Sequence, residues 1–171
     1  MQTASESDQT RCGHSRVKLT VLTLVKARSA SSPSSRPIPL LLYPPEGGIF
    51  LRPSKAGPVV AVLERTFPPF ARQVIGYTEV AHEEASPFEF AMALSQPGQP
   101  ADWRTEMPGN CLEFSGWKRV DEKFQLHEIA LENRQLTKAA LDVNLAIRLP
   151  RRSEPSPANA YWRKLVFAWD Q

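Results

Sequence analysis

The clearest candidate for chemistry in this sequence is a run of cations and aromatic residues between positions 148 and 164. Arginine and lysine can neutralise phosphates, and aromatic rings can stack on bases, as proteins that bind single strands require. The pattern predicts a nucleic-acid surface made by Arg148, Arg151, Arg152, Trp162, Arg163 and Lys164. The competing interpretation is a positively charged loop leading into a strand whose aromatic side chains belong to the core.

A second candidate is the triplet Asp121-Glu122-Lys123, which spells half of a metal-dependent nuclease site. In such a site a second carboxylate would complete the magnesium ligands while Lys123 positions the attacking water. The sequence offers three acidic residues for that role, Asp102, Glu106 and Glu113. The same triplet also fits a solvated turn between Trp117 and Phe124.

The residues that could bind a resident metal are not spaced to do so. The pairs His82-Glu83 and His127-Glu128 begin like the helix of a zinc protease, but neither is followed by the second histidine that chelation needs. A cysteine and histidine set can be assembled only from Cys12, His14, Cys111 and His127, which are scattered along the sequence. We therefore predict no metal, no cofactor and no catalytic residue.

Residues 28–33 have the form of a phosphorylation site for a basophilic kinase. Arg28 stands three residues before Ser31, and Pro33 stands two residues after it. A phosphate on Ser31 would give an arginine cluster on a partner protein a group to bind. The alternative is a plain serine-rich loop.

The elements that must position these residues are delimited by the 16 prolines. Proline removes a backbone donor and fixes φ, so it lies between elements or at sheet edges. Between the prolines, apolar runs and alternating patterns predict short strands at 17–25, 39–43, 49–51, 58–63, 73–80, 141–149 and 165–169. In the strand at 141–149, Leu141, Val143 and Leu145 predict one buried face, opposite a solvated face.

Two segments favour helices. Ser86 and Pro87 offer an N-cap and a first helical residue, with Glu89 placed to complete a capping box, which predicts a short helix over 87–95. Apolar residues at helical spacing predict a longer helix over 125–140. A strand is the alternative at 87–95, because Phe88, Phe90, Met92 and Leu94 alternate, and a hairpin is the alternative at 125–140.

These elements predict an α+β fold, a mainly antiparallel β-sheet that is sandwich-like or a half-barrel, with one short and one longer helix. The alternative is an all-β sandwich. We expect residues 1–15 to be a disordered tail and residues 16–171 to be a single domain. That domain would carry a Ser/Pro/Arg-rich loop at 28–39 and a basic, proline-rich loop at 150–158.

The composition bounds the function without specifying it. A net charge of +3 spread among mixed signs is typical of a solvated surface, and no apolar run is long enough to cross a membrane. We expect a cytoplasmic or nuclear protein with no membrane association. The best-supported function is a non-enzymatic protein-interaction or assembly module within a larger complex, bound to a protein partner or to itself. Nucleic-acid binding over 148–164 is the alternative, and a nuclease around Asp121 and Lys123 the second alternative.

Overall fold

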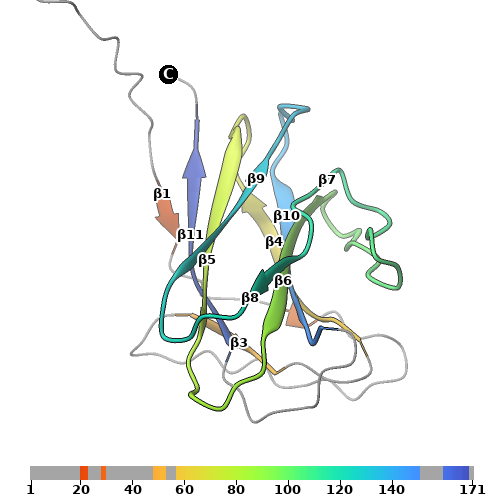
Figure 1. Ribbon diagram of the computed structural model, residues 1–171. Helices are drawn as coiled ribbons and strands as arrows, with labels where there is room; N and C mark the ends of the chain where they lie inside the picture. The colour runs from red at the N-terminus through yellow and green to blue at the C-terminus, as the bar shows by residue number, and fades with distance from the viewer. Residues whose placement is uncertain (1–19, 23–27, 30–47, 53–56, 151–159, 170–171) are drawn as a thin grey trace, which may run out of the picture.

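The computed structural model describes residues 20–22, 28–29, 48–52, 57–150 and 160–169, which form two antiparallel β-sheets (Figure 1). We call the first the β5 sheet, because β5 lies inside it. Its strand order is β1 (Thr20–Leu22), β11 (Ala160–Ala168), β5 (Gln73–Val80) and β9 (His127–Glu132), and β3 (Ile49–Leu51) also pairs with β11.

The second sheet is named the β10 sheet after its central strand. Its order is β2 (Arg28–Ser29), β4 (Val59–Phe67), β10 (Leu141–Arg148), β6 (Phe88–Ser95) and β7 (Glu113–Phe114), and β8 (Lys118–Val120) also pairs with β6. Every strand pairing among the described residues is antiparallel. The expected mainly antiparallel β-structure is therefore confirmed.

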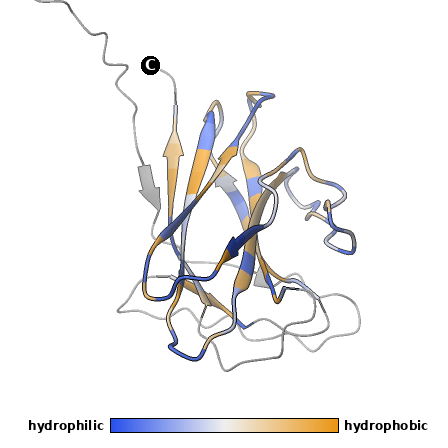
Figure 2. Ribbon diagram, viewed as in Figure 1, coloured by the Kyte–Doolittle hydropathy of each residue, from blue (hydrophilic) through white to orange (hydrophobic). Residues whose placement is uncertain are grey.

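One hydrophobic core lies between the two sheets. Its members come from both, and aromatic pairs join the layers: the Phe90 ring meets the Trp162 indole edge to face at 5.7 Å between centroids, and Phe67 meets Phe167 in the same way at 5.7 Å. Figure 2 shows hydrophobic residues concentrated in the strands and hydrophilic ones in the connecting loops and in β8. Burial of apolar side chains from both layers holds the sheets face to face.

The outer face of the β10 sheet is also buried, which the sequence did not predict. The expected solvated face of β10 contains Asp142 and Asn144, which are 1% and 0% exposed. The connection from β6 to β8, residues 96–117, which we call the covering segment, passes over this face and also supplies β7. Its Trp103 and Trp117 side chains pack on Val60, Val62 and Ala146. Asp142 accepts a hydrogen bond from the backbone of Gly98 at 2.9 Å, and Asn144 accepts one from that of Ala101 at 3.2 Å.

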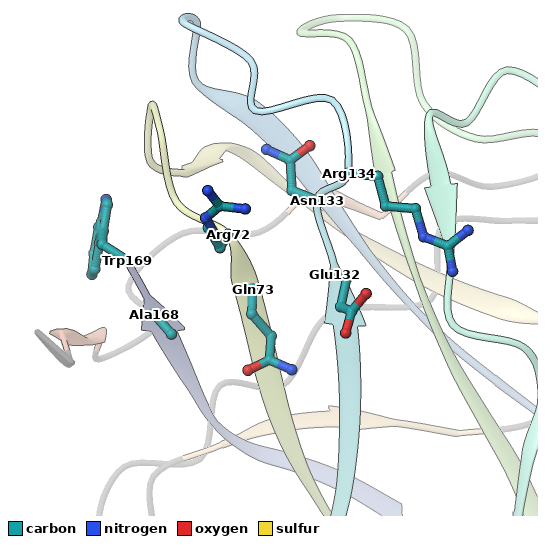
Figure 3. A pocket seen from close by; sticks show the side chains of 7 residues that line it. All are labelled: Arg72, Gln73, Glu132, Asn133, Arg134, Ala168 and Trp169. Carbon is teal, nitrogen blue, oxygen red and sulfur yellow. The ribbon is translucent and has the colours of Figure 1, made fainter. Parts of the chain in front are cut away.

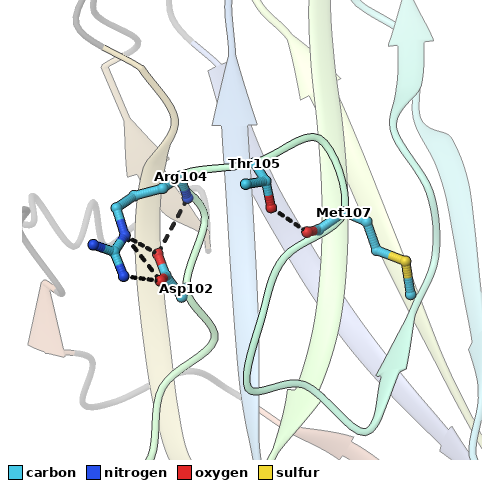
Figure 4. Close-up of polar contacts among 4 residues, drawn as sticks. All are labelled: Asp102, Arg104, Thr105 and Met107. Carbon is cyan, nitrogen blue, oxygen red and sulfur yellow. Dashed lines mark hydrogen bonds and ion pairs between the residues drawn. The ribbon is translucent and has the colours of Figure 1, made fainter.

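The covering segment contains a closed loop (Figure 4). Asp102 and Gly109 exchange two backbone hydrogen bonds of 2.8 Å, and the Asp102 carboxylate also binds the Arg104 guanidinium, which lowers the pKa of Asp102. The Thr105 hydroxyl donates to the carbonyl of Met107, whose side chain is exposed. These bonds fix the loop that crosses the β10 sheet.

The outer face of the β5 sheet is more open. Along β5, the side chains of Gln73, Ile75, Tyr77 and Glu79 alternate with buried residues and are half-exposed. Along β9, Glu128, Ala130 and Glu132 are exposed, whereas Ile129 and Leu131 are buried. Of the two outer faces, this one is accessible to a ligand.

Both predicted helices are wrong, because the described residues contain no helix. The segment expected as a helix at 87–95 is β6, which pairs with β10 over seven consecutive residues. The segment expected at 125–140 is β9 followed by a loop. A cap signal and a helical stripe are local preferences of less than about 2 kcal/mol, and burial between two sheets outweighs them.

The strand predictions hold better. The expected strand at 73–80 is β5 with the same bounds, and those at 49–51, 58–63, 141–149 and 165–169 correspond to β3, β4, β10 and β11. Part of the segment expected as a strand at 17–25 forms β1. Arg28 belongs to the short β2, whereas Ser31, Pro33, residues 1–15 and 39–43 lie outside the described residues. No helix that could span a membrane occurs in the described part of the chain.

Candidate functional site

The candidate site lies at the end of the sandwich where β5 begins. Three segments meet there: the β4–β5 loop at 68–72, the β9–β10 loop at 133–140, and Trp169, which follows β11. We call this region the loop end. Loops at the end of a rigid sheet are the part of such a fold that can carry binding residues at low cost to the core.

Backbone hydrogen bonds join the three segments. The Phe70 amide donates to the Thr137 carbonyl at 3.0 Å, the Asn133 amide to the Arg72 carbonyl at 2.7 Å, and the Arg72 amide to the Ala168 carbonyl at 2.8 Å. The buried Asn133 side chain adds a bond from Nδ2 to the Ala71 carbonyl at 3.1 Å. The loop end is therefore held in one arrangement without a bound partner.

Two apolar side chains on these loops are exposed in an unusual backbone conformation. Phe70 is 57% exposed with φ of 59°, and Leu136 is 37% exposed with φ of 45°. A left-handed conformation costs a residue with a side chain about 1–2 kcal/mol, and Phe70 still leaves more than half of its surface in solvent. Because the Phe70 amide binds the Thr137 carbonyl, both of these strained, partly exposed side chains lie on loops that are joined to each other.

A cavity of about 550 Å³, which we call the Gln73 cavity, opens beside these loops and is lined by Arg72, Gln73, Glu132, Asn133, Arg134, Ala168 and Trp169. Three paired strands form its floor. Ala168 of β11 pairs with Gln73 of β5, and Gln73 pairs with Glu132 of β9. Figure 3 shows Trp169 at one side, Glu132 and Arg134 at the other, and Gln73 between them.

The Gln73 cavity mixes hydrogen-bond donors and acceptors. Two guanidinium groups, two carboxamides and one carboxylate surround it, beside one indole. The Trp169 indole is fixed by a bond from Nε1 to the Pro69 carbonyl at 3.3 Å and packs partly against the core. This set can bind a small polar ligand, but it contains no nucleophile with an adjacent base.

The residues proposed for nucleic acid are dispersed by the fold. The Arg148 guanidinium binds Glu89 and Glu106, each at 2.5 Å, and stacks on the Trp117 ring. The bonds to Glu106 and Glu89 raise the pKa of Arg148. Trp162 lies in the core with 0% exposure, so its ring is not at the surface where stacking on a base would occur.

The other two described cations of that set, Arg163 and Lys164, lie on the open outer face of the β5 sheet. Arg163 pairs with Glu79 at 2.5 Å, and the exposed Lys164 lies over the Tyr77 ring at 4.6 Å. Tyr77 has a raised pKa through burial and the nearby Glu128. Arg151 and Arg152 fall outside the described residues. The described cations of the set are thus matched by carboxylates or rings.

The residues proposed for a nuclease do not converge either. The Asp121 carboxylate pairs with Arg119 at 2.8 Å, and Lys123 Nζ donates to the Glu83 backbone carbonyl. Within the described ranges, no three His, Cys, Asp or Glu side chains are grouped to hold a metal ion. Cys111 lies apart, half-buried, with its pKa raised by desolvation.

Sequence reasoning missed the loop end. The Phe67-Pro68-Pro69-Phe70 corner was visible as a rigid turn, but nothing in the sequence placed it beside residues 133–140. The strand register that gathers Gln73, Glu132 and Ala168 depends on long-range pairing, which a local pattern does not encode. The positive φ of Phe70 has no signal in its residue type, because phenylalanine rarely adopts it.

A family profile described as a family of unknown function (DUF6212) matches residues 2–148. The match includes both loops of the loop end, while Trp169 follows it. No curated protein and no solved structure is similar enough to match this chain.

Proposed function

The chain belongs to the DUF6212 family, a family of unknown function, and from the geometry of its loop end we propose a non-enzymatic protein-interaction module whose partner binds over Phe70. The observation that carries the proposal is the Phe70 side chain, exposed by 57% on a backbone with φ of 59°. Phe124 has the same exposure and a similar φ, so the proposal also depends on where Phe70 lies, on a loop that is hydrogen-bonded to the β9–β10 loop.

Preorganisation supports the same conclusion. The bond from the Phe70 amide to Thr137 and the bond from Trp169 Nε1 to Pro69 hold the β4–β5 loop from both sides. A loop that is ordered before binding loses little entropy when a partner arrives. Aromatic anchors on such surfaces contribute much of the binding energy at protein interfaces.

The test uses two matched glycine substitutions. Phe124 is also 57% exposed with a left-handed φ of 56°, but its amide binds the carbonyl of Val80, at the far end of β5. The strand β5, whose eight residues span about 26 Å, lies between the two positions. Phe70→Gly and Phe124→Gly therefore make the same chemical change at opposite ends of the molecule.

We expect Phe70→Gly to lower the affinity for the partner about 30-fold, since loss of an aromatic anchor costs about 2 kcal/mol. Phe124→Gly should leave the affinity unchanged. Both variants should unfold within about 1 kcal/mol of the wild type, because relief of strain offsets the entropy of glycine. A purely structural Phe70 would instead reduce stability and binding together.

The partner is found by placing a photoreactive phenylalanine analogue at position 70 or 124 in cells that make the protein. A discrete cross-linked protein obtained from position 70 and not from 124 is then purified, and its affinity for each variant is measured by calorimetry. If the product is a second copy of this chain, sedimentation replaces calorimetry. Equal cross-linking from both positions, or unchanged binding by Phe70→Gly, would contradict the proposal.

A further inference from the structure

The Gln73 cavity is not lined by Phe70, so it is a second candidate binding site. Its volume of about 550 Å³ is within the range of small-molecule sites. Three adjacent strands supply its floor, so Ala168, Gln73 and Glu132 keep their spacing in the free protein. Loops move more readily than paired strands, and a floor made by strands gives a ligand fixed groups to recognise.

The polar groups of the cavity call for a ligand that donates and accepts hydrogen bonds. Arg72 and Arg134 can only donate through their side chains, Glu132 can only accept, and Gln73 can do both. Asn133, which is 3% exposed, has a buried Oδ1 that accepts no hydrogen bond from any group the structure describes. This Oδ1 lies below the molecular surface, so the side chains that meet a ligand are those of Gln73, Glu132, Arg72 and Arg134.

The indole of Trp169 adds an apolar wall. Its Nε1 is already bonded to the Pro69 carbonyl at 3.3 Å, so the ring orientation is set before a ligand binds. One part of the side chain packs on the core, and the remainder lines the cavity. Figure 3 shows this ring standing at the edge of the cavity, across from Glu132.

From these contacts we infer that the Gln73 cavity binds a saccharide. Hydroxyl groups donate to Glu132 and accept from Gln73 and the arginines, while the C–H face of a sugar ring packs on Trp169. A phosphate would meet the Glu132 carboxylate in the floor, and a wholly apolar ligand would make no hydrogen bonds with the polar groups that it covers. A polyhydroxylated ring satisfies both kinds of group.

The experiment screens the purified full chain against immobilised neutral and acidic saccharides, then titrates the strongest binder into ¹⁵N-labelled protein. We expect the side-chain amide signals of Gln73 and Asn133 and the indole N–H signal of Trp169 to shift. Gln73→Ala should weaken binding about tenfold, as loss of a hydrogen bond of about 1.4 kcal/mol predicts. Trp169→Ala should abolish binding.

Two controls test whether the saccharide binds in the Gln73 cavity rather than elsewhere on the surface. Glu132→Gln should weaken binding, whereas Glu128→Gln, an equally exposed position on the same face of β9 outside the cavity, should not. Phe70→Gly should keep saccharide binding, so the two proposals fail or succeed independently. The inference is overturned if no saccharide binds with a Kd below about 10 mM, or if Gln73→Ala and Glu132→Gln bind as the wild type does.

Discussion

Gly76 allows the largest side chain of the core to lie between the sheets. A Cβ atom at this position would come within 2.5 Å of the Trp162 ring and 2.9 Å of the Met92 sulfur. The sequence predicted a strand here, but the need for glycine could not be read from it, because the contact joins residues from three strands. The same contact explains why Trp162 is a core residue although charged residues follow it.

We expect Gly76→Ala to lower the free energy of unfolding by about 2 kcal/mol, since the methyl group must displace a packed indole. Gly109→Ala is the matched control, because its Cβ would lie 3.7 Å from the nearest atom, an ordinary contact. Urea titration of both variants measures the difference. Equal stabilities would show that Trp162 can move aside without loss.

At the scale of elements, regular alternation was predictable and its interruptions were not. β5 was predicted with its observed bounds as a β run after the Phe67-Pro68-Pro69-Phe70 corner, and its residues alternate between half-exposed and buried from Gln73 to Val80. In β11, a bulge between Trp162 and Lys164 places two outward residues in succession, so Trp162 and Leu165 are both buried. No local pattern in the sequence marks that extra residue.

The helix predicted over 125–140 failed for a related reason. The apolar residues at helical spacing include Ile129, which is buried, but also Leu126 and Ala130, which are exposed, and they omit the buried Leu131. Because β9 borders only β5 in its sheet, its outer row can be polar, with Glu128 solvated. A short strand with polar residues on one face and a helix with both polar and apolar residues on each face give similar sequence patterns.

The prediction at the scale of elements concerns the covering segment. Asn144 accepts from Ala101 and donates to Ser95 Oγ at 2.9 Å and to the Ala93 carbonyl at 3.3 Å, so it ties the segment to β10 and β6. Asn144→Ala leaves buried groups without partners and should destabilise the protein by about 2–3 kcal/mol. Hydrogen exchange should accelerate in residues 96–117 more than in β5.

The control is Gln99→Ala in the same segment, whose side chain is exposed. It should change the free energy of unfolding by less than about 0.5 kcal/mol. If Asn144→Ala exchanges no faster than Gln99→Ala, the aromatic contacts of Trp103 and Trp117 hold the segment without this bond.

At the scale of the whole molecule, strand pairing explains why Arg148, Arg163 and Lys164 do not form one basic surface. Arg148 and Arg163 are paired with carboxylates on neighbouring strands, and Lys164 lies over an aromatic ring. The sequence shows clusters of like charge, whereas cross-strand pairing brings opposite charges from distant positions together. Because the described cations of that set already have partners, we base the proposed function on the loop end, while binding of nucleic acid over 148–164 stays an untested prediction.

The shared core predicts how the molecule unfolds. Phe90 and Phe67 of the β10 sheet pack on Trp162 and Phe167 of the β5 sheet, so neither sheet can separate without exposing the apolar face of the other. We expect the single domain anticipated from chain length to unfold in one cooperative step. Far-ultraviolet circular dichroism reports the strands, while tryptophan fluorescence reports Trp162 in the core, Trp103 and Trp117 in the covering segment, and Trp169 at the loop end. The two urea transitions should have the same midpoint and slope; if the fluorescence change came first, the covering segment would detach before the sandwich opens.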